Sequence, residues 1–269
     1  MNQTHSTVSI SVMSGKGGVG KTNLTLNLGY ALYELKRTLM LIDCDLGLAN
    51  LDVLLGISPE KNLQDLLRPD IDARNVLCAL EKGGLDFLPA ASGVPELVEM
   101  DEDLRDQLLR RLNHLFRRYN YLLLDLGAGI SSTVLSFAAM SRARVIVLTP
   151  EPTSLTDSYA LMKVLATRKG VRDFFLVINQ VSGNDETKKT YSRIRTTCER
   201  FLGISPHLLG QIRHDTHVLD SVCRQIPLLR YAPSCPASQD IMSLARKIDS
   251  LRTRMLPGIA GKEVFDLEG

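Results

Sequence analysis

The sequence predicts an α/β fold in which a doubly wound, mostly parallel sheet is flanked by helices on both faces. Apolar strand-like runs alternate with helical patterns along the chain, an order typical of parallel sheets covered on both sides. A glycine-rich loop lies between the first run and the first helical pattern, as phosphate-binding loops do. The chain of 269 residues shows no internal repeat, so we expect one domain over residues 1–256 and a short flexible tail over residues 257–269.

The apolar runs give the expected strands, and apolar residues spaced three or four apart give the expected helices. The strands are Val8–Met13, Thr38–Ile42, Leu85–Leu88, Tyr121–Leu124, Val145–Thr149, Phe174–Ile178 and His207–Ile212. The helices are Asn23–Leu35, Asp101–Arg118, Ser131–Ser141, Thr153–Lys169, Lys188–Leu202 and Ser238–Met255. Ligands of such sheets bind beyond the carboxyl ends of the strands, so the motifs found there carry the functional prediction.

The first of these motifs reads Ser-Gly-Lys-Gly-Gly-Val-Gly-Lys-Thr from Ser14 to Thr22. Its glycines let successive backbone N–H groups converge on phosphate oxygens, and the following helix adds the partial positive charge of its N-terminus. Lys21 is expected to neutralise the β- and γ-phosphates, and the Thr22 hydroxyl to bind Mg²⁺. The predicted nucleotide-binding residues of this loop are Gly15, Lys16, Gly17, Gly18, Val19, Gly20, Lys21, Thr22 and Asn23. The alternative is a glycine-rich turn that binds no ligand.

Lys16 is a second lysine in the loop. Its side chain is expected to leave the loop on the side away from the phosphates, where it would have no use within one protomer. Two loops that face each other would let each Lys16 reach the partner's nucleotide and stabilise charge in the transition state. Lys16 and Lys21 are therefore both predicted to be catalytic. The alternative for Lys16 is a solvated surface lysine.

Carboxylates follow two of the expected strands. Asp43 and Asp45 close the second strand, where a carboxylate costs desolvation energy unless it serves a cation or a water. The alternative for Asp45 is a helix N-cap.

The strand Tyr121–Leu124 ends at Asp125, an arrangement in which the aspartate contacts Mg²⁺ through its water shell. Gly127 and Gly129 follow, and they allow the backbone to approach the γ-phosphate and to rearrange when it leaves. We therefore expect a switch segment at Leu126–Ile130, with Gly127 binding nucleotide. The alternative is a plain strand-to-helix turn.

The loop Lys16-Gly17-Gly18-Val19-Gly20-Lys21-Thr22 closely resembles the deviant Walker A motif of the MinD/ParA ATPases. This resemblance implies a P-loop ATPase domain that binds ATP or ADP and Mg²⁺. It implies a metal site made by Thr22, Asp43 in the outer shell, and Asp125. It also implies that Asp45 positions the attacking water.

The same resemblance gives Asn179 the task of reading adenine, because an amide donates and accepts in one plane. The alternative is an ordinary turn asparagine. The segment Leu209–Asp215 resembles the stretch that covers the base in that family, with Arg213 where the family has proline. Arg213 is expected to contact nucleotide by stacking on the base.

Two further stretches, Asp45–Asp52 and Thr149–Ala160, resemble the flagellar-number regulators FlhG and FleN, and the resemblance runs from about Val8 to Leu251. It implies an ATP-dependent homodimer that regulates the number and placement of bacterial flagella. The implied partners are the signal-recognition-type GTPase FlhF and a flagellar transcriptional activator. Met1–Thr7 lacks the segment by which such regulators stimulate the GTPase, so stimulation is not expected.

The composition bears on rival functions. With 32 basic and 30 acidic residues the formal net charge is +2, which gives no support to direct DNA binding. A ParA-type ATPase that positions DNA or another cargo is the alternative. A nitrogenase-type reductase needs cysteines that bracket the switch segment Leu126–Ile130. Cys78 and Cys198 are the nearest cysteines on either side of Asp125, so this class is not favoured. Intact Asp45 and Asp125 argue against a regulator that binds nucleotide without turnover.

The cysteine content and the hydropathy indicate a cytoplasmic protein, with a peripheral site on the inner face of the cell membrane as a further expectation. The five cysteines show no C-x-x-C spacing, and no apolar stretch approaches the ~20 residues of a membrane span. Ser238–Met255 is interpreted as a helix packed on the sheet, with a membrane anchor as the alternative. Beyond it, Val264 and Phe265 offer apolar surface among acidic residues, so weak binding to anionic lipid is expected.

Two polar stretches receive no catalytic assignment. His214-Asp215-Thr216-His217 is interpreted as a polar loop, because the sequence shows no further ligands that would converge with it on a metal. The charged helix Asp101–Arg118 is interpreted as solvated, with a partner-binding face as the alternative.

Overall fold

The computed structural model describes residues 7–45, 50–68, 70–90, 112–113, 115–259 and 264–265. Its centre is a sheet in the order β3-β4-β2-β5-β1-β6-β7-β8, in which every pair is parallel except β3 with β4. The strands are β1 Val8–Met13, β2 Leu39–Cys44, β3 Cys78–Glu81, β4 Leu85–Leu88, β5 Tyr121–Leu126, β6 Ala143–Leu148, β7 Phe175–Val181 and β8 His207–Arg213. The predicted fold class is confirmed.

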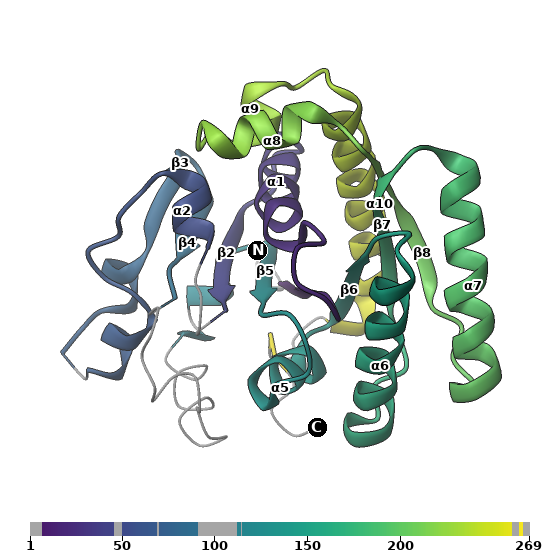
Figure 1. Ribbon diagram of the computed structural model, residues 1–269. Helices are drawn as coiled ribbons and strands as arrows, with labels where there is room; N and C mark the ends of the chain where they lie inside the picture. Colours follow the sequence, from purple (N-terminus) through teal and green to yellow (C-terminus); the bar gives the residue numbers. More distant parts are fainter. Residues whose placement is uncertain are drawn as a thin grey trace.

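Helices cover both faces of the sheet (Figure 1). The α-helices are α1 Lys21–Glu34, α2 Leu51–Leu55, α5 Ser132–Met140, α6 Pro152–Lys169, α7 Asn184–Leu202, α8 Thr216–Cys223, α9 Leu228–Tyr231 and α10 Pro236–Ile259, and the 3₁₀ helices are Leu63–Leu67 and Ala73–Val76. Side chains of α1, α9 and α10 share one buried cluster with one face of the sheet, and those of α5, α6 and α7 share another cluster with the opposite face. Strand residues alternate between the clusters, as the period of two requires.

The helix α10 packs on the sheet as predicted. Its residues Ile241, Leu244 and Ile248 are buried in the core. Asp249 on the same helix accepts hydrogen bonds from Arg37 at 2.8 Å and from the Tyr121 hydroxyl at 2.9 Å. None of the helices in the described part of the chain combines the length and the apolar character that crossing a membrane requires.

Several elements differ from the prediction. The edge strand β3 was not expected. Ala79 in it is exposed and its other three residues are partly buried, and its register with β4 shifts between Ala79 and Glu81. The short helices α2, α8 and α9 were also not expected, because so few turns give no helical period to detect. The predicted helix Asp101–Arg118 falls mainly outside the described residues.

The segment after α10 returns to the core. Val264 and Phe265 are 5% and 4% exposed. The Phe265 ring lies edge-on to Phe116, with the ring centroids 5.5 Å apart, and Ser9 Oγ donates a hydrogen bond to the Val264 carbonyl at 3.0 Å. The expectation that these two residues form apolar surface is therefore wrong, because both are buried in the core cluster that includes side chains of α5 and α6.

Candidate active site

Three neighbouring central strands, β2, β5 and β1, bring the predicted phosphate- and metal-binding residues together at their carboxyl ends. β1 leads into the glycine-rich loop, and β2 and β5 lie on the same side of it (Figure 1). Asp125 on β5 is the register partner of Val12 on β1 and of Asp43 on β2. Parallel pairing thus places the two aspartates side by side next to the loop.

The loop uses its glycines in different ways. Gly18 and Gly20 have φ of 80° and 86°, a left-handed conformation that favours glycine, and α1 begins directly after Gly20. A Cβ on Gly17 or Gly18 would meet nothing within 4 Å, so the space above the loop is open. A Cβ on Gly15 would lie 2.2 Å from the backbone of Asp157. Gly15 therefore serves the close packing of the loop against α6.

Lys21, Thr22 and Asp125 converge at the start of α1. Lys21 Nζ lies 3.0 Å from Asp125 Oδ1 and 3.2 Å from Thr22 Oγ1. The side chains of Lys21 and Asp125 are 8% and 1% exposed. A buried carboxylate is costly without compensation, and this lysine supplies the opposite charge. The lysine and hydroxyl predicted for phosphate and Mg²⁺ thus share one point with the predicted metal-site aspartate.

Thr25 is a member of this cluster that the sequence analysis missed. Its Oγ1 lies 2.8 Å from Asp125 Oδ1 and 3.0 Å from the Lys21 carbonyl, and its single proton serves one of these acceptors at a time. Thr25 lies one turn after Lys21, on the same side of α1. That spacing was the available signal.

Asp43 is a buried carboxylate that organises the chain after β2. Its oxygens accept hydrogen bonds from the backbone N–H groups of Asp45, Asn50 and Leu51 at 3.0, 3.1 and 3.2 Å. Burial raises its pKa to about 7, and the neighbouring charge of Asp125 adds to this shift. Asp43 therefore lies beside Asp125 as predicted, but it also holds the start of α2.

Asp45 does not cap the helix that follows it. The N-cap of α2 is Asn50, and the N–H groups there point to Asp43. The capping alternative for Asp45 is therefore wrong. A Cβ added to Gly127 would lie 3.4 to 3.6 Å from the Asp45 carboxyl group. Asp43, inside β2, thus faces inward, and Asp45, directly after β2, faces the segment that follows β5.

The predicted switch segment Leu126–Ile130 begins inside β5, because Leu126 is the last residue of that strand. Gly129 has φ of 93°, and its N–H donates to the Ser14 carbonyl at 3.0 Å. Ile130 is 52% exposed. The predicted switch segment and the phosphate loop are therefore directly connected through their backbones.

Lys16 has partners within its own protomer. Its Nζ lies 2.6 Å from Glu151 Oε2 and 3.0 Å from Thr153 Oγ1, at the start of α6. The expectation that Lys16 lacks a use within one protomer is wrong. Its sequence context gave no sign of Glu151, which lies in a distant segment.

A cavity of about 320 Å³ adjoins the loop where a base would follow the phosphates. The predicted residues Gly20, Asn23, Asn179 and Arg213 line it, together with Leu24, Gln180, Ile212, His214, Asp215, Val218, Leu219, Val222 and Ile241. The α8 side chains were not predicted. The cavity is apolar over most of its wall, with a few polar groups that can orient a ligand.

The two predicted base-binding side chains are held firmly in this cavity. Asn179 donates to the Val19 carbonyl at 2.8 Å and accepts from the N–H of Gln180 at 2.9 Å. Arg213 pairs with both carboxyl oxygens of Asp240 at 2.8 and 2.9 Å. Asn179 thereby ties β7 to the phosphate loop. Arg213 ties the end of β8 to α10, while it remains part of the cavity wall.

Comparison with known proteins agrees with this geometry. Residues 10–228 match the model of the CobQ/CobB/MinD/ParA nucleotide-binding domain. The antiactivator FleN of Pseudomonas aeruginosa is 36% identical over 93% of this chain and 89% of its own length. The flagellum site-determining protein YlxH of Helicobacter pylori is 33% identical over 88% of this chain and 80% of its own length.

Solved structures show the same similarity. The septum site-determining protein MinD of Pyrococcus horikoshii, complexed with Mg-ADP, superposes with a TM-score of 0.75 and 25% identity over 91% of this chain and 97% of its own. The MinC:MinD cell division complex of Aquifex aeolicus superposes with a TM-score of 0.71 and 28% identity, over 90% of this chain and 96% of its own.

Proposed function

The chain belongs to the CobQ/CobB/MinD/ParA nucleotide-binding family and is an ATP hydrolase of the MinD/ParA type, and on this premise we propose that it works as a Mg²⁺-dependent, ATP-driven dimerisation switch. The observation that carries the proposal is the convergence of Lys21, Thr22 and Asp125 beneath an open glycine loop. Asp45 and Gly127 face each other beside it.

The residues present fit Mg-ATP. The N–H groups of the loop and Lys21 would bind the phosphates, and Thr22 and Asp125 would hold Mg²⁺, with Asp43 behind them. When bound, the ion would neutralise phosphate charge. Asn179 and the apolar wall of the cavity would position the base. This supports ATP and ADP as the ligands.

Asp45 is proposed to orient the attacking water. Hydrolysis of ATP depends mostly on placement and charge neutralisation. Asp45 lies beside Gly127, where the backbone leaves the strand that carries Asp125. Loss of the γ-phosphate would then be sensed by the switch segment, whose Gly129 is bonded to the phosphate loop.

Lys16 is proposed to act across the dimer. Its ion pair with Glu151 has side chains that are 38% and 58% exposed, and such pairs contribute only about 0–1 kcal/mol. The pair can therefore open at little cost when a partner's nucleotide approaches. Opening of the Lys16–Glu151 ion pair would link dimerisation to the start of α6.

The relative YlxH, a flagellum site-determining protein, supports a cellular role in the placement of bacterial flagella, and the sequence resemblance to flagellar-number regulators adds their number to this role. The term antiactivator supports a transcriptional activator as one partner, while the GTPase FlhF stays a prediction from the sequence. A cytoplasmic location is part of the same proposal, and binding to the inner membrane surface is expected to be weak.

Two measurements test the proposal. Light scattering with ATP and Mg²⁺ is expected to show a dimer that ADP does not support, and Lys21→Ala should lose both the dimer and hydrolysis. In cells that lack the chain, flagellar number or position should change, and Lys21→Ala should not restore it. Normal flagella in the deletion strain would contradict the cellular role but not the switch.

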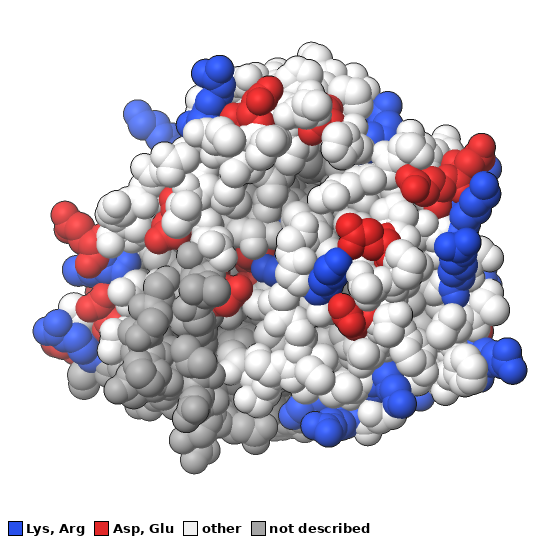
Figure 2. Space-filling model, in the orientation of Figure 1, with Lys and Arg blue, Asp and Glu red and all other residues white. Residues whose placement is uncertain are grey.

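The ParA-type alternative needs a basic surface for DNA. Figure 2 shows acidic and basic side chains interspersed over the face that carries the loop, with both kinds along the edge formed by α7. This mixed pattern favours a protein partner over a nucleic acid on that face. Retention on nonspecific DNA that depends on ATP would reverse this preference.

A further inference from the structure

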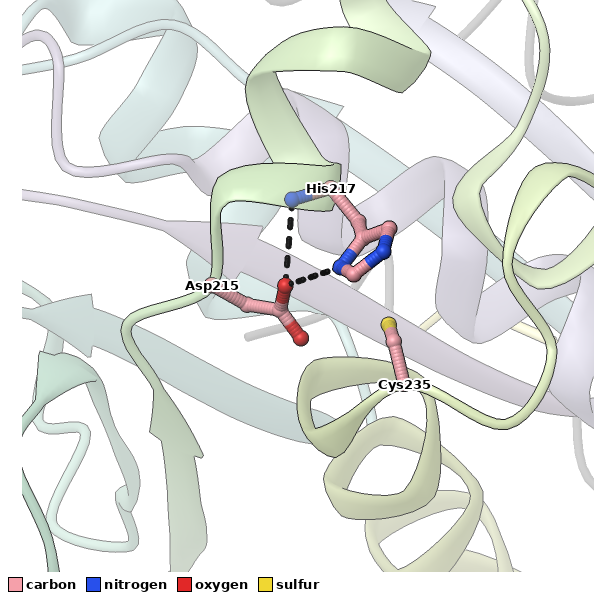
Figure 3. A group of neighbouring side chains, drawn as sticks. All are labelled: Asp215, His217 and Cys235. Atoms are coloured by element: carbon pink, nitrogen blue, oxygen red, sulfur yellow. Dashed lines mark hydrogen bonds and ion pairs between the residues drawn. The ribbon is translucent and has the colours of Figure 1, made fainter.

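Three side chains with metal-binding chemistry converge beside the nucleotide cavity. Asp215 and His217 lie at the start of α8, and Cys235 lies directly before α10 (Figure 3). Within the described ranges, one ligand atom of each residue lies within 4.8 Å of the other two. The sequence alone favours polar loop residues for the first two, and it gives no sign of Cys235, because the cysteine belongs to a distant segment.

Asp215 holds this cluster in place. Its Oδ1 accepts the N–H of His217 at 3.0 Å and lies 2.7 Å from His217 Nδ1, while its Oδ2 accepts the N–H of Ala237 at 3.1 Å. Capping the starts of α8 and α10 explains the carboxylate. Capping gives no reason for an imidazole and a thiol to meet at the same carboxylate.

The other two members differ in exposure. Cys235 is 7% exposed, and its Sγ lies 3.3 Å from Ser238 Oγ. The His217 side chain is 50% exposed. The cluster thus has a buried sulfur donor, a fixed carboxylate and an imidazole that faces solvent. An ion can enter the cluster from the solvent-exposed side, where His217 lies.

We propose that Asp215, His217 and Cys235 form a binding site for a divalent ion of the zinc type, with three protein ligands and a fourth position open to water. Zn²⁺ accepts nitrogen, oxygen and sulfur ligands at about 2.0–2.3 Å in tetrahedral geometry, which places ligand atoms about 3.5 Å apart. The distances in the cluster lie around this value, because Asp215 Oδ1 and His217 Nδ1 are 2.7 Å apart and one ligand atom of each of the three residues lies within 4.8 Å of the others. Rotation of the exposed His217 ring supplies the adjustment. The thiol proton of Cys235 leaves to solvent when the ion binds.

This site differs chemically from the proposed Mg²⁺ site. Mg²⁺ prefers oxygen ligands, as Thr22 and Asp125 provide, whereas sulfur and imidazole favour zinc. The two sites are linked through Asp215, which also lines the cavity. An ion at the cluster would fix the turn between β8 and α8 against the start of α10, and so fix one wall of the cavity.

Titration of the purified, reduced chain with Co²⁺, without nucleotide or Mg²⁺, tests the site. We expect a thiolate-to-metal charge-transfer band that Zn²⁺ abolishes by displacement. Cys235→Ser should remove the band, and His217→Ala should weaken binding more than tenfold. Cys223→Ser and His214→Ala are the matched controls, because both residues are exposed neighbours outside the cluster, and both should keep the band.

Thermal unfolding gives a second readout. Zn²⁺ should raise the Tm of the wild type and leave that of His217→Ala unchanged, while circular dichroism shows that both are folded. Absence of the band in the wild type, or its persistence in Cys235→Ser, would overturn the proposal. Either result leaves the proposal of an ATP-dependent switch unaffected, because that switch is measured with ATP and Mg²⁺ in the absence of Zn²⁺ and Co²⁺.

Discussion

At the scale of single residues, the two aspartates at the carboxyl end of β2 have different surroundings and therefore different expected roles. Asp43 is 1% exposed and its oxygens accept three backbone N–H groups. Asp45 is only partly buried and faces Gly127. Asp43 is thus suited to ordering the backbone behind a metal site, and Asp45 to contact with a water molecule.

We expect Asp45→Ala to trap the ATP-bound dimer. The change removes the carboxylate that positions water and leaves Lys21, Thr22 and Asp125 in place, so turnover should fall about 10²–10⁴-fold, the range for a positioned general base. Phosphate release and light scattering measure the two effects. Asp52→Ala, a partly buried carboxylate on α2, is the control. Near-normal turnover of Asp45→Ala would exclude the catalytic role.

The Lys16–Glu151 pair makes a second prediction at this scale. Lys16→Ala should bind ATP but neither dimerise nor hydrolyse it. Glu151→Gln releases Lys16 from its own protomer, so it should strengthen the ATP dimer by up to about fivefold per protomer, the equivalent of about 1 kcal/mol. Sedimentation at graded protein concentration measures both. A normal dimer in Lys16→Ala would show that the lysine does not act across the interface.

At the scale of elements, the features that were predicted correctly are those that a motif or an apolar run marks locally in the sequence. The loop from Ser14 to Thr22 and the strands that end at Asp43 and Asp125 were found because a motif or an apolar run marks them. Thr25 and Glu151 were not predicted. The one-turn spacing of Thr25 from Lys21 places it on the same side of α1, but the partner Asp125 is far away in sequence, and Glu151 has no local signal at all. The pairing of Lys16 with Glu151 is a tertiary contact that no periodicity records.

The segment after α10 is expected to stabilise the fold. Phe265→Ala removes a ring that packs on Phe116, and truncation of a buried phenylalanine costs about 3–5 kcal/mol. Urea unfolding should show a lower midpoint with an unchanged slope. Phe201→Ala, whose side chain is 62% exposed on α7, should change the midpoint little. Equal midpoints for both variants would mean that the segment does not hold the core together.

The attachment of α10 predicts a pH dependence. Hydrogen bonds from Arg37, and then from Tyr121, lower the pKa of Asp249 below its usual value. A carboxyl group with a lowered folded-state pKa stabilises above its unfolded pKa of about 4, and this contribution is lost as pH falls through the folded value. Asp249→Asn should therefore be less stable than the wild type at about pH 7, and the difference should shrink at about pH 3. A difference that grows on acidification would contradict this sign.

At the scale of the whole molecule, the two ends of the parallel strands hold different features. The predicted ATP site lies at the carboxyl ends of β1, β2 and β5, whereas Val264 and Phe265 are buried under the opposite ends. Association with another surface must therefore use residues outside this buried pair, or must first release it.

This placement leads to a prediction about membranes. The apolar stripe of α10 and the Val264–Phe265 pair both face the core, so the ADP-bound chain should sediment poorly with anionic vesicles. ATP joins two copies, and avidity can raise weak binding by about 10²–10⁴ where the geometry allows both to engage. Asp45→Ala with ATP supplies a stable dimer for this test, and Phe265→Ala separates release of the buried segment from dimerisation. We expect little vesicle binding in either variant. Strong ATP-dependent binding that Phe265→Ala enhances without ATP would show that the buried segment is a membrane anchor, held against the core until it is released.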